Sequence, residues 1–147
     1  MKKLLLAAAA FLIALQLNAA DSTWLTDFAA AQKKAKDEKK LVLLDFTGSD
    51  WCPPCIKLKK DVLSTKEFLD YAKTNFVLVE VDFPKRKQLS PEQQQANSAL
   101  SQKYNIEAFP TIVVVKSDGE EVWRQMSYVP GGPKAWIGML EEAKKKG

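Results

Sequence analysis

Hydrophobic and polar positions follow two patterns along this chain, a helical repeat and continuous apolar runs, and these patterns predict its first elements. Apolar residues recur at helical spacing over residues 24–38, so we expect an amphipathic helix there. Two later runs, Leu41–Phe46 and Phe76–Asp82, are apolar on both alternating faces. That pattern is typical of central strands covered on both sides. The first run contains one ionisable residue, Asp45.

Local signals predict the helices of the middle of the chain. The stretch from residue 51 continues as a helix, and Ser64–Glu67 restarts it with a capping-box pattern. Ser90 offers an N-cap, Pro91 suits the first helical position, and Gln93 can return a contact to the cap. We expect this helix to end near Tyr104.

The last third of the chain contains a hairpin and a closing helix. Thr111–Val115 and Glu121–Arg124 flank an Asp-Gly pair, which is a strong hairpin signal. Lys134–Lys145 follows a glycine-proline break and is predicted to be helical. The resulting order is αβαβαββα. It predicts an α/β fold with a mixed central sheet and helices on both faces.

Residues 1–20 have the layout of a secretory signal peptide. Two lysines precede an apolar run that ends at Leu17. This run is shorter than the ~20 residues that a membrane-spanning helix needs, and Asn18–Ala20 supplies small residues for cleavage. We therefore expect cleavage near Ala20, with membrane anchoring as the alternative. A single domain over residues 21–147 would then be periplasmic or secreted.

Charge and residue counts exclude several classes of function. The chain has 22 basic and 18 acidic residues, and its basic run over residues 33–40 mixes both signs at helical spacing. A solvated helix face explains that run, so we expect no nucleic-acid partner. Two cysteines without any histidine exclude Ser-His and Cys-His pairs. A tetrahedral zinc site would need carboxylates or a second chain. We expect a monomer without metal or cofactor.

The two cysteines, Cys52 and Cys55, are separated by two residues where a buried strand meets a helix. A thiol at a helix N-terminus loses its proton more easily, and the thiolate is the attacking species. We expect Cys52 to take this exposed position. Cys55, one turn further, can attack a mixed disulfide on Cys52. A structural crosslink is the alternative, but so small a ring contributes only ~2 kcal/mol.

Three motifs together resemble the thioredoxin superfamily, and their order and spacing match over residues 24–146. They are Asp45-Phe46, Trp51-Cys52-Pro53-Pro54-Cys55 and Ala108-Phe109-Pro110-Thr111. The resemblance implies a thioredoxin-like fold in which Pro110 is cis and lies beside Cys52. It also implies that the backbone of Phe109 pairs with an extended substrate segment. Trp51 and Phe109 would then belong to the rim that meets protein substrates.

Asp45 is the candidate proton acceptor. A carboxyl group in a strand that is apolar on both faces should have a raised pKa, and the resemblance gives this acid the task of deprotonating Cys55. An aspartate that reaches solvent at the strand end is the alternative. The sequence departs from the family at Glu80, where many members carry a lysine. An inward Glu80 would raise the Asp45 pKa further, and a solvent-facing Glu80 is equally compatible with the sequence.

Both residues between the cysteines are proline, so neither offers an N–H to a Cys52 thiolate. A less stabilised thiolate makes a weaker oxidant. The sequence therefore favours a reductase of disulfides in extracytoplasmic proteins, and the resemblance implies a membrane-embedded electron donor as its partner. The alternatives are a disulfide-introducing oxidase, a Cu(I)-delivery module that uses the same two thiolates, and a binding module with incidental cysteines.

Overall fold

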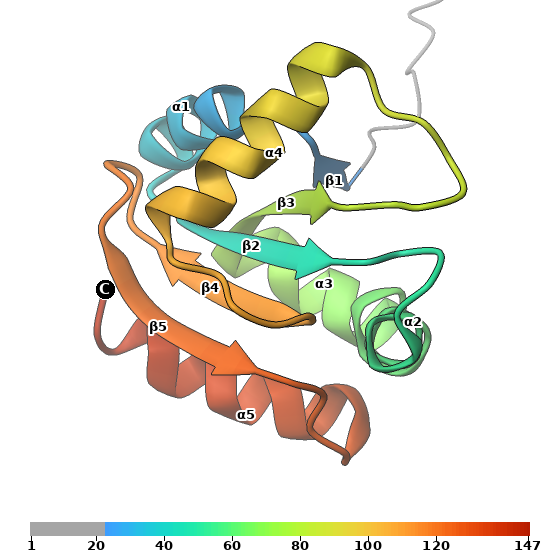
Figure 1. The fold of residues 1–147 in the computed structure, drawn as a ribbon. Coiled ribbons are helices and arrows are strands. Elements are labelled where there is room, and N and C mark those ends of the chain that lie inside the picture. Colours follow the sequence, from blue (N-terminus) through green and yellow to red (C-terminus); the bar gives the residue numbers. More distant parts are fainter. Residues whose placement is uncertain (1–22) are drawn as a thin grey trace, which may run out of the picture.

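The computed structural model describes residues 23–147, so the expected signal peptide lies outside the described residues. A mixed sheet of five strands has the order β1-β3-β2-β4-β5 (Figure 1). Strands β1, β3 and β2 run parallel, and β4 is antiparallel to both β2 and β5. The strands are β1 (Trp24–Leu25), β2 (Leu41–Thr47), β3 (Phe76–Asp82), β4 (Thr111–Val115) and β5 (Glu121–Met126).

Helices cover both faces of this sheet, as the sequence predicts. The helices are α1 (Phe28–Glu38), α2 (Pro53–Leu58), the π-helical turn η1 (Lys59–Leu63), α3 (Lys66–Asn75), α4 (Pro91–Lys103) and α5 (Gly132–Lys144). One apolar cluster joins the sheet to α1 and α4, and a second joins it to α2, η1, α3 and α5 (Figure 1). Between residues 23 and 147 no helix is long and apolar enough to cross a membrane.

The face of the sheet on which each β2 side chain lies decides the chemistry available to it. Val42, Leu44 and Phe46 pack under α1 and α4, whereas Leu43 packs under α3 and α5. Alternate residues of a strand share a face. Asp45 therefore lies on the face of the sheet that carries α2 and η1, which is the side of the cysteines.

The start of the domain differs from the prediction. Residues 24–25 form the edge strand β1, which pairs with Leu78 and Val79 of β3, and they are not the first turn of a helix. Asp27 caps α1 by accepting a hydrogen bond from the N–H of Ala30 at 3.0 Å. The described element order therefore begins with a strand, because pairing with β3 overrides the local helical periodicity.

Two predicted caps are formed differently. Ser90 accepts a hydrogen bond from the N–H of Gln93, as predicted, but the Gln93 amide donates to Asn97 and to the Thr26 carbonyl and not to the cap. Helix α3 is capped by Thr65 and not by Ser64. Both differences leave the predicted helices in place.

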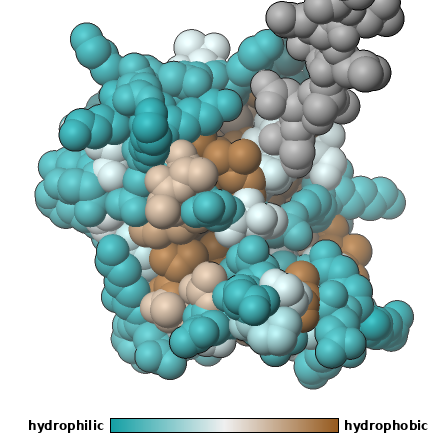
Figure 2. Space-filling view, turned by 90° about the horizontal axis from the view of Figure 1, so that it is seen from above, coloured by the Kyte–Doolittle hydropathy of each residue, from teal (hydrophilic) through white to brown (hydrophobic). Residues whose placement is uncertain are grey.

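An apolar groove of about 560 Å³ runs between α1 and α4. Its apolar lining includes Phe28, Ala29, Ala96, Ala99 and Leu100. Figure 2 looks onto this side and shows apolar side chains in the open between hydrophilic ones. The cysteines lie elsewhere, at the start of α2, which follows the carboxyl end of β2 after a short turn.

Candidate redox site

Cys52 and Cys55 form a disulfide at the start of α2. Cys52 is the N-cap residue and has an extended backbone, and Cys55 lies in the first turn of the helix. Both are buried, with exposed fractions of 4% and 3%. The expectation of an exposed Cys52 is therefore wrong for this oxidised state. The sulfur of Cys52 lies 3.8 Å from the carbonyl oxygen of Phe109, so a distant loop covers it.

The turn before the cysteines is shaped by Gly48. Its carbonyl oxygen accepts from the N–H groups of Trp51 and Cys52 at 3.3 and 3.0 Å. Its own N–H donates to Cys55 Sγ at 3.5 Å. A Cβ at this position would come within 2.5 Å of the Trp51 ring, so a side chain does not fit without moving that ring. Gly48 thus places both cysteines, a role that sequence reasoning did not assign.

The loop that covers Cys52 contains a cis peptide bond between Phe109 and Pro110, as the resemblance implies. Pro110 is buried and Phe109 is half-buried. The Pro110 carbonyl accepts from the N–H of Ser127 at 2.9 Å, and the Thr111 hydroxyl donates to the Ala108 carbonyl at 2.7 Å. These bonds hold the Phe109 backbone beside Cys52.

Three aromatic side chains join this loop to the cysteine turn. The Trp51 ring meets Phe109 edge to face at 6.1 Å, and Phe109 stacks on Phe83 at 5.2 Å. The indole N–H of Trp51 donates to the Phe83 carbonyl at 2.7 Å. Trp51 is half-buried, so it is both packed and accessible at the rim. No motif in the sequence points to Phe83, which directly follows β3.

Asp45 is enclosed on the face of the sheet that carries α2 and η1. Only 2% of the residue is exposed, which excludes the alternative of an aspartate that reaches solvent. Its Oδ1 accepts no hydrogen bond from any described residue. Burial raises the Asp45 pKa to about 7, the Glu80 carboxylate adds to this shift, and the Lys59 ammonium opposes it. The carboxyl group can therefore change protonation state near neutral pH.

Glu80 faces inward, which settles the orientation that the sequence left open. It is the β3 partner of Asp45 in the strand register, and its side chain is 17% exposed. Its Oε2 lies 2.5 Å from the Nζ of Lys59 in the π-helical turn. A cation therefore lies near the buried Asp45, but it is Lys59 of η1 and not a lysine of β3. The signal for Lys59 was its position one helical turn beyond Cys55.

Comparison with known proteins places this site in a family. The profile of the thioredoxin-like domain matches residues 28–144. This chain belongs to the thioredoxin-like family. Thioredoxin-like relatives include the disulfide bond reductase DsbH of Chlamydia pneumoniae, which is 36% identical over 129 residues, or 88% of this chain and 76% of DsbH. The thioredoxin-related protein DsbJ of the same organism is 33% identical over 71% of this chain and 30% of its own length.

Solved structures agree with this family assignment. The structure of a DsbH oxidoreductase has a TM-score of 0.78 and 35% identity and covers 83% of both chains. The C-terminal domain of Neisseria meningitidis DsbD in its oxidised form has a TM-score of 0.56 and 26% identity, over 78% of this chain and 90% of that domain. This thioredoxin-like protein is therefore homologous to thiol-disulfide oxidoreductases. Among residues 23–147 no group of three or more metal-ligating side chains comes together.

Proposed function

We propose that this protein is an exported oxidoreductase that reduces disulfides in extracytoplasmic proteins, with Cys52 as the attacking thiol and Cys55 as the resolving thiol. The observation that carries the proposal is the placement of the Cys52–Cys55 disulfide. The Cys52 sulfur lies beside the Phe109 backbone, where a substrate can pair, and Asp45 is buried on the face of the sheet that carries α2. The name of the relative DsbH, a disulfide bond reductase, supports the direction of electron flow.

The reaction starts from the reduced pair. The Cys52 thiolate attacks a substrate disulfide, so that one S–S bond breaks, a mixed disulfide forms on Cys52, and one substrate thiolate leaves and takes a proton. Asp45 accepts the proton of Cys55, whose thiolate then attacks Cys52. The second substrate thiol leaves protonated, and the Cys52–Cys55 disulfide remains. Two electrons have passed to the substrate, so a donor must supply two electrons for the next cycle.

The surroundings of the sulfurs suit these two steps. The Gly48 N–H, which points at Cys55 Sγ, can stabilise the thiolate that forms there. A small cavity of about 250 Å³, lined partly by Cys55 and Lys59, adjoins the resolving cysteine. Trp51, Phe109 and Ile56, which is 46% exposed, offer apolar surface to an unfolded or extended substrate.

The two prolines at the first positions of α2 favour reduction. Pro53 and Pro54 have no N–H to offer Cys52, so the reduced form lacks two donors. A poorly stabilised thiolate gives a reducing pair. The donor in this proposal is a membrane-embedded protein, because a reductase outside the cytoplasm needs electrons that cross the membrane. The signal peptide expected over residues 1–20 supports that location.

The test is reduction of insulin in the presence of dithiothreitol, together with trapping of mixed disulfides. We expect the wild-type protein to accelerate insulin precipitation and Cys52→Ser to lose this effect. Cys55→Ser is the matched variant, because it keeps the attacking thiol and should hold partners as mixed disulfides on Cys52. An absence of cysteine-dependent reduction, with tight Cu(I) binding by the reduced protein, would show a metal-delivery module instead.

The direction of electron flow has its own measurement. Equilibration with glutathione gives the reduction potential of the cysteine pair, and a reductase should lie near the value of about −270 mV that thioredoxin has. A potential near about −120 mV, as in strongly oxidising proteins, would overturn the reductase assignment in favour of disulfide introduction.

A further inference from the structure

The loop of residues 83–89 is fastened to the cysteine turn at two points. The Asp50 carboxylate accepts hydrogen bonds from the backbone N–H groups of Lys85, Arg86 and Lys87 at 2.9, 2.7 and 3.1 Å. The Trp51 indole donates to the Phe83 carbonyl at 2.7 Å. Asp50 and Trp51 directly precede Cys52. The loop is therefore held at the mouth of the redox site.

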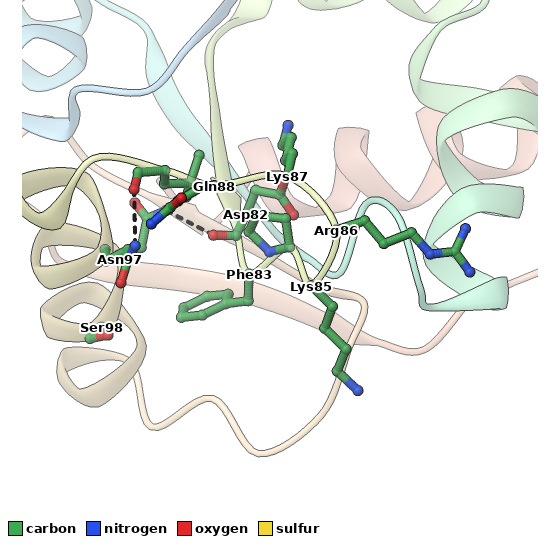
Figure 3. A pocket seen from close by; sticks show the side chains of 11 residues that line it. Asp82, Phe83, Lys85, Arg86, Lys87, Gln88, Asn97 and Ser98 are labelled. Atoms are coloured by element: carbon green, nitrogen blue, oxygen red, sulfur yellow. Dashed lines mark hydrogen bonds and ion pairs between the residues drawn. The ribbon is translucent and has the colours of Figure 1, made fainter.

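The charges of this loop are divided between an inner and an outer side. Asp82 is buried, accepts from the backbone and hydroxyl of Ser49 at 3.0 and 2.5 Å, and lies 3.1 Å from the Lys87 ammonium. Asp50 is occupied by the three N–H groups. The Lys85 and Arg86 residues border a cavity beside the loop, and their exposed side chains extend away from Asn97 and Ser98 of α4 (Figure 3). The outward charge beside the site is therefore positive.

The positive charge of Lys85 lies over the ring of Trp51, the residue next to the attacking Cys52. Its Nζ lies 4.0 Å from the centroid of the Trp51 ring, within the range of a cation–π contact. Trp51 directly precedes Cys52 and its ring meets Phe109 edge to face, so this ring borders both points at which a polypeptide would be held. Exposed charges act over roughly a Debye length, about 10 Å at 0.1 M salt.

A cavity between the 83–89 loop and α4 could take polar side chains of a bound substrate. It has a volume of about 500 Å³ and lies between the loop and α4 (Figure 3). Gln88, Asn97 and Ser98 line it together with the loop. Asn97 donates to the Asp82 backbone carbonyl at 2.9 Å, which fixes this wall.

We propose that Lys85 and Arg86 make this protein select substrates whose disulfide is flanked by aspartate or glutamate residues. The inference rests on the proposed function, because it concerns the substrates of the same cysteine pair. Complementary charges near a reacting site increase the rate of productive encounter and disfavour partners of like charge. A segment with acidic residues beside its cystine meets the two cations, whereas a basic segment is repelled.

The experiment compares two disulfide-linked peptides that differ only in having Glu or Lys on both sides of the cystine. The fully reduced protein is mixed with each peptide, and the single-turnover rate is measured at low and high salt. We expect the acidic peptide to react roughly tenfold faster at low ionic strength, and the ratio to fall toward one in high salt. Both peptides meet the same protein, so the ratio of the two rates cancels any effect of a substitution on Cys52 and Cys55.

Two charge-reversed proteins complete the design. Lys85→Glu/Arg86→Glu should abolish or invert the ratio. Lys36→Glu/Lys146→Glu changes the net charge equally and should keep it. Lys36 is in the last turn of α1. Lys146 precedes Gly147, which lines a pocket together with Leu41 at the start of β2, the opposite end of that strand from the cysteines.

Each outcome decides one question. Equal rates for the two peptides in the wild-type protein at low salt, or a preference that survives in Lys85→Glu/Arg86→Glu, would overturn this inference and leave the proposed function intact. Failure of the reduced protein to reduce either peptide would overturn the proposed function itself.

Discussion

Asp45 and Asp50 lie on either side of the same short turn, yet their surroundings are opposite. Asp45 is at the end of a buried strand, has an oxygen without a described partner and faces Glu80. Burial first and Glu80 second raise its pKa to about 7. Asp50 is in the half-buried turn before Cys52, and backbone N–H groups of the 83–89 loop hold its pKa below the ordinary range.

The difference shows how one residue type serves two purposes. A carboxyl group that is buried with few hydrogen bonds can accept and release a proton near neutral pH. A carboxylate that accepts three backbone hydrogen bonds stays ionised and holds a loop in place. In this protein the first is Asp45, on the face of the sheet that carries α2, and the second is Asp50, in the turn before Cys52. In the proposed function Asp45 moves the proton, whereas Asp50 holds the loop that carries Lys85 and Arg86.

The largest effect is expected from Asp45→Asn, which removes the proton acceptor and keeps the shape of the side chain. We expect the resolving step at pH 7 to slow by about 100-fold, because general bases typically contribute that much. The measurement is the single-turnover release of substrate from the mixed disulfide. Asp50→Asn is the matched control and should leave this step unchanged. A rate for Asp45→Asn within twofold of the wild type would show that Asp45 takes no part.

The same substitution predicts a change in stability with pH. The Asp45 pKa is higher in the folded state than in the unfolded state, so its contribution is fully present below about pH 4 and is lost as the pH rises through 7. At 1.36 kcal/mol per pKa unit, the whole loss from below pH 4 to above pH 7 is on the order of 4 kcal/mol, and roughly two thirds of it falls between pH 5 and pH 8. Urea unfolding at pH 5 and pH 8 should show the loss in the wild type and not in Asp45→Asn. Parallel curves for the two proteins would contradict the raised pKa.

A smaller effect is expected from Glu80→Gln. The substitution removes a like charge near Asp45 and frees the Lys59 ammonium from its partner. Both changes lower the Asp45 pKa, so the midpoint in the pH profile of turnover should move down by about one unit. Lys59→Met should move it up. Glu92→Gln, on an exposed part of α4, is the control and should not move it. An unmoved midpoint in Glu80→Gln would remove Glu80 and Lys59 from the mechanism.

The features of the fold and of the redox site that depend on a local sequence pattern could be predicted from the sequence. Burial of Asp45 followed from a strand that is apolar on both faces, and the redox pair followed from its spacing at a strand-helix junction. The strand-helix order of the main sheet was also predictable, since each period is local. The two-residue strand β1 was not, because its pairing with β3 depends on a segment more than fifty residues away.

Parts of the site that depend on distant segments could not be predicted in the same way. The cover over Cys52 comes from Phe109, which the resemblance to the thioredoxin superfamily implied and local pattern did not, and the residues that Asp50 binds are on the 83–89 loop. Neither contact leaves a periodic signal in the sequence. Lys59 had a signal, its position one turn after Cys55, but only the structure shows that it meets Glu80. The burial of Asp45 was thus predictable, whereas the contact between Glu80 and Lys59, which both shift the Asp45 pKa, was not.

The smallest effect is expected from Asp50→Ala, and it should be confined to the loop. The N–H groups of Lys85, Arg86 and Lys87 lose their acceptor, so their hydrogen-exchange protection should fall by roughly tenfold, while the thermal midpoint stays nearly unchanged. Asp50→Asn keeps one acceptor oxygen and should retain part of the protection.

The pH dependence of this local effect completes the contrast with Asp45. The Asp50 pKa is lower in the folded state, so its contribution is present above the ordinary aspartate range and is lost as the pH falls through the folded value. Protection of the Lys85–Lys87 amides should therefore hold between pH 5 and pH 8, where the Asp45 contribution is lost, and decline only in more acidic solution. Loss of this protection between pH 5 and pH 8 would mean that Asp50 and Asp45 are not independent.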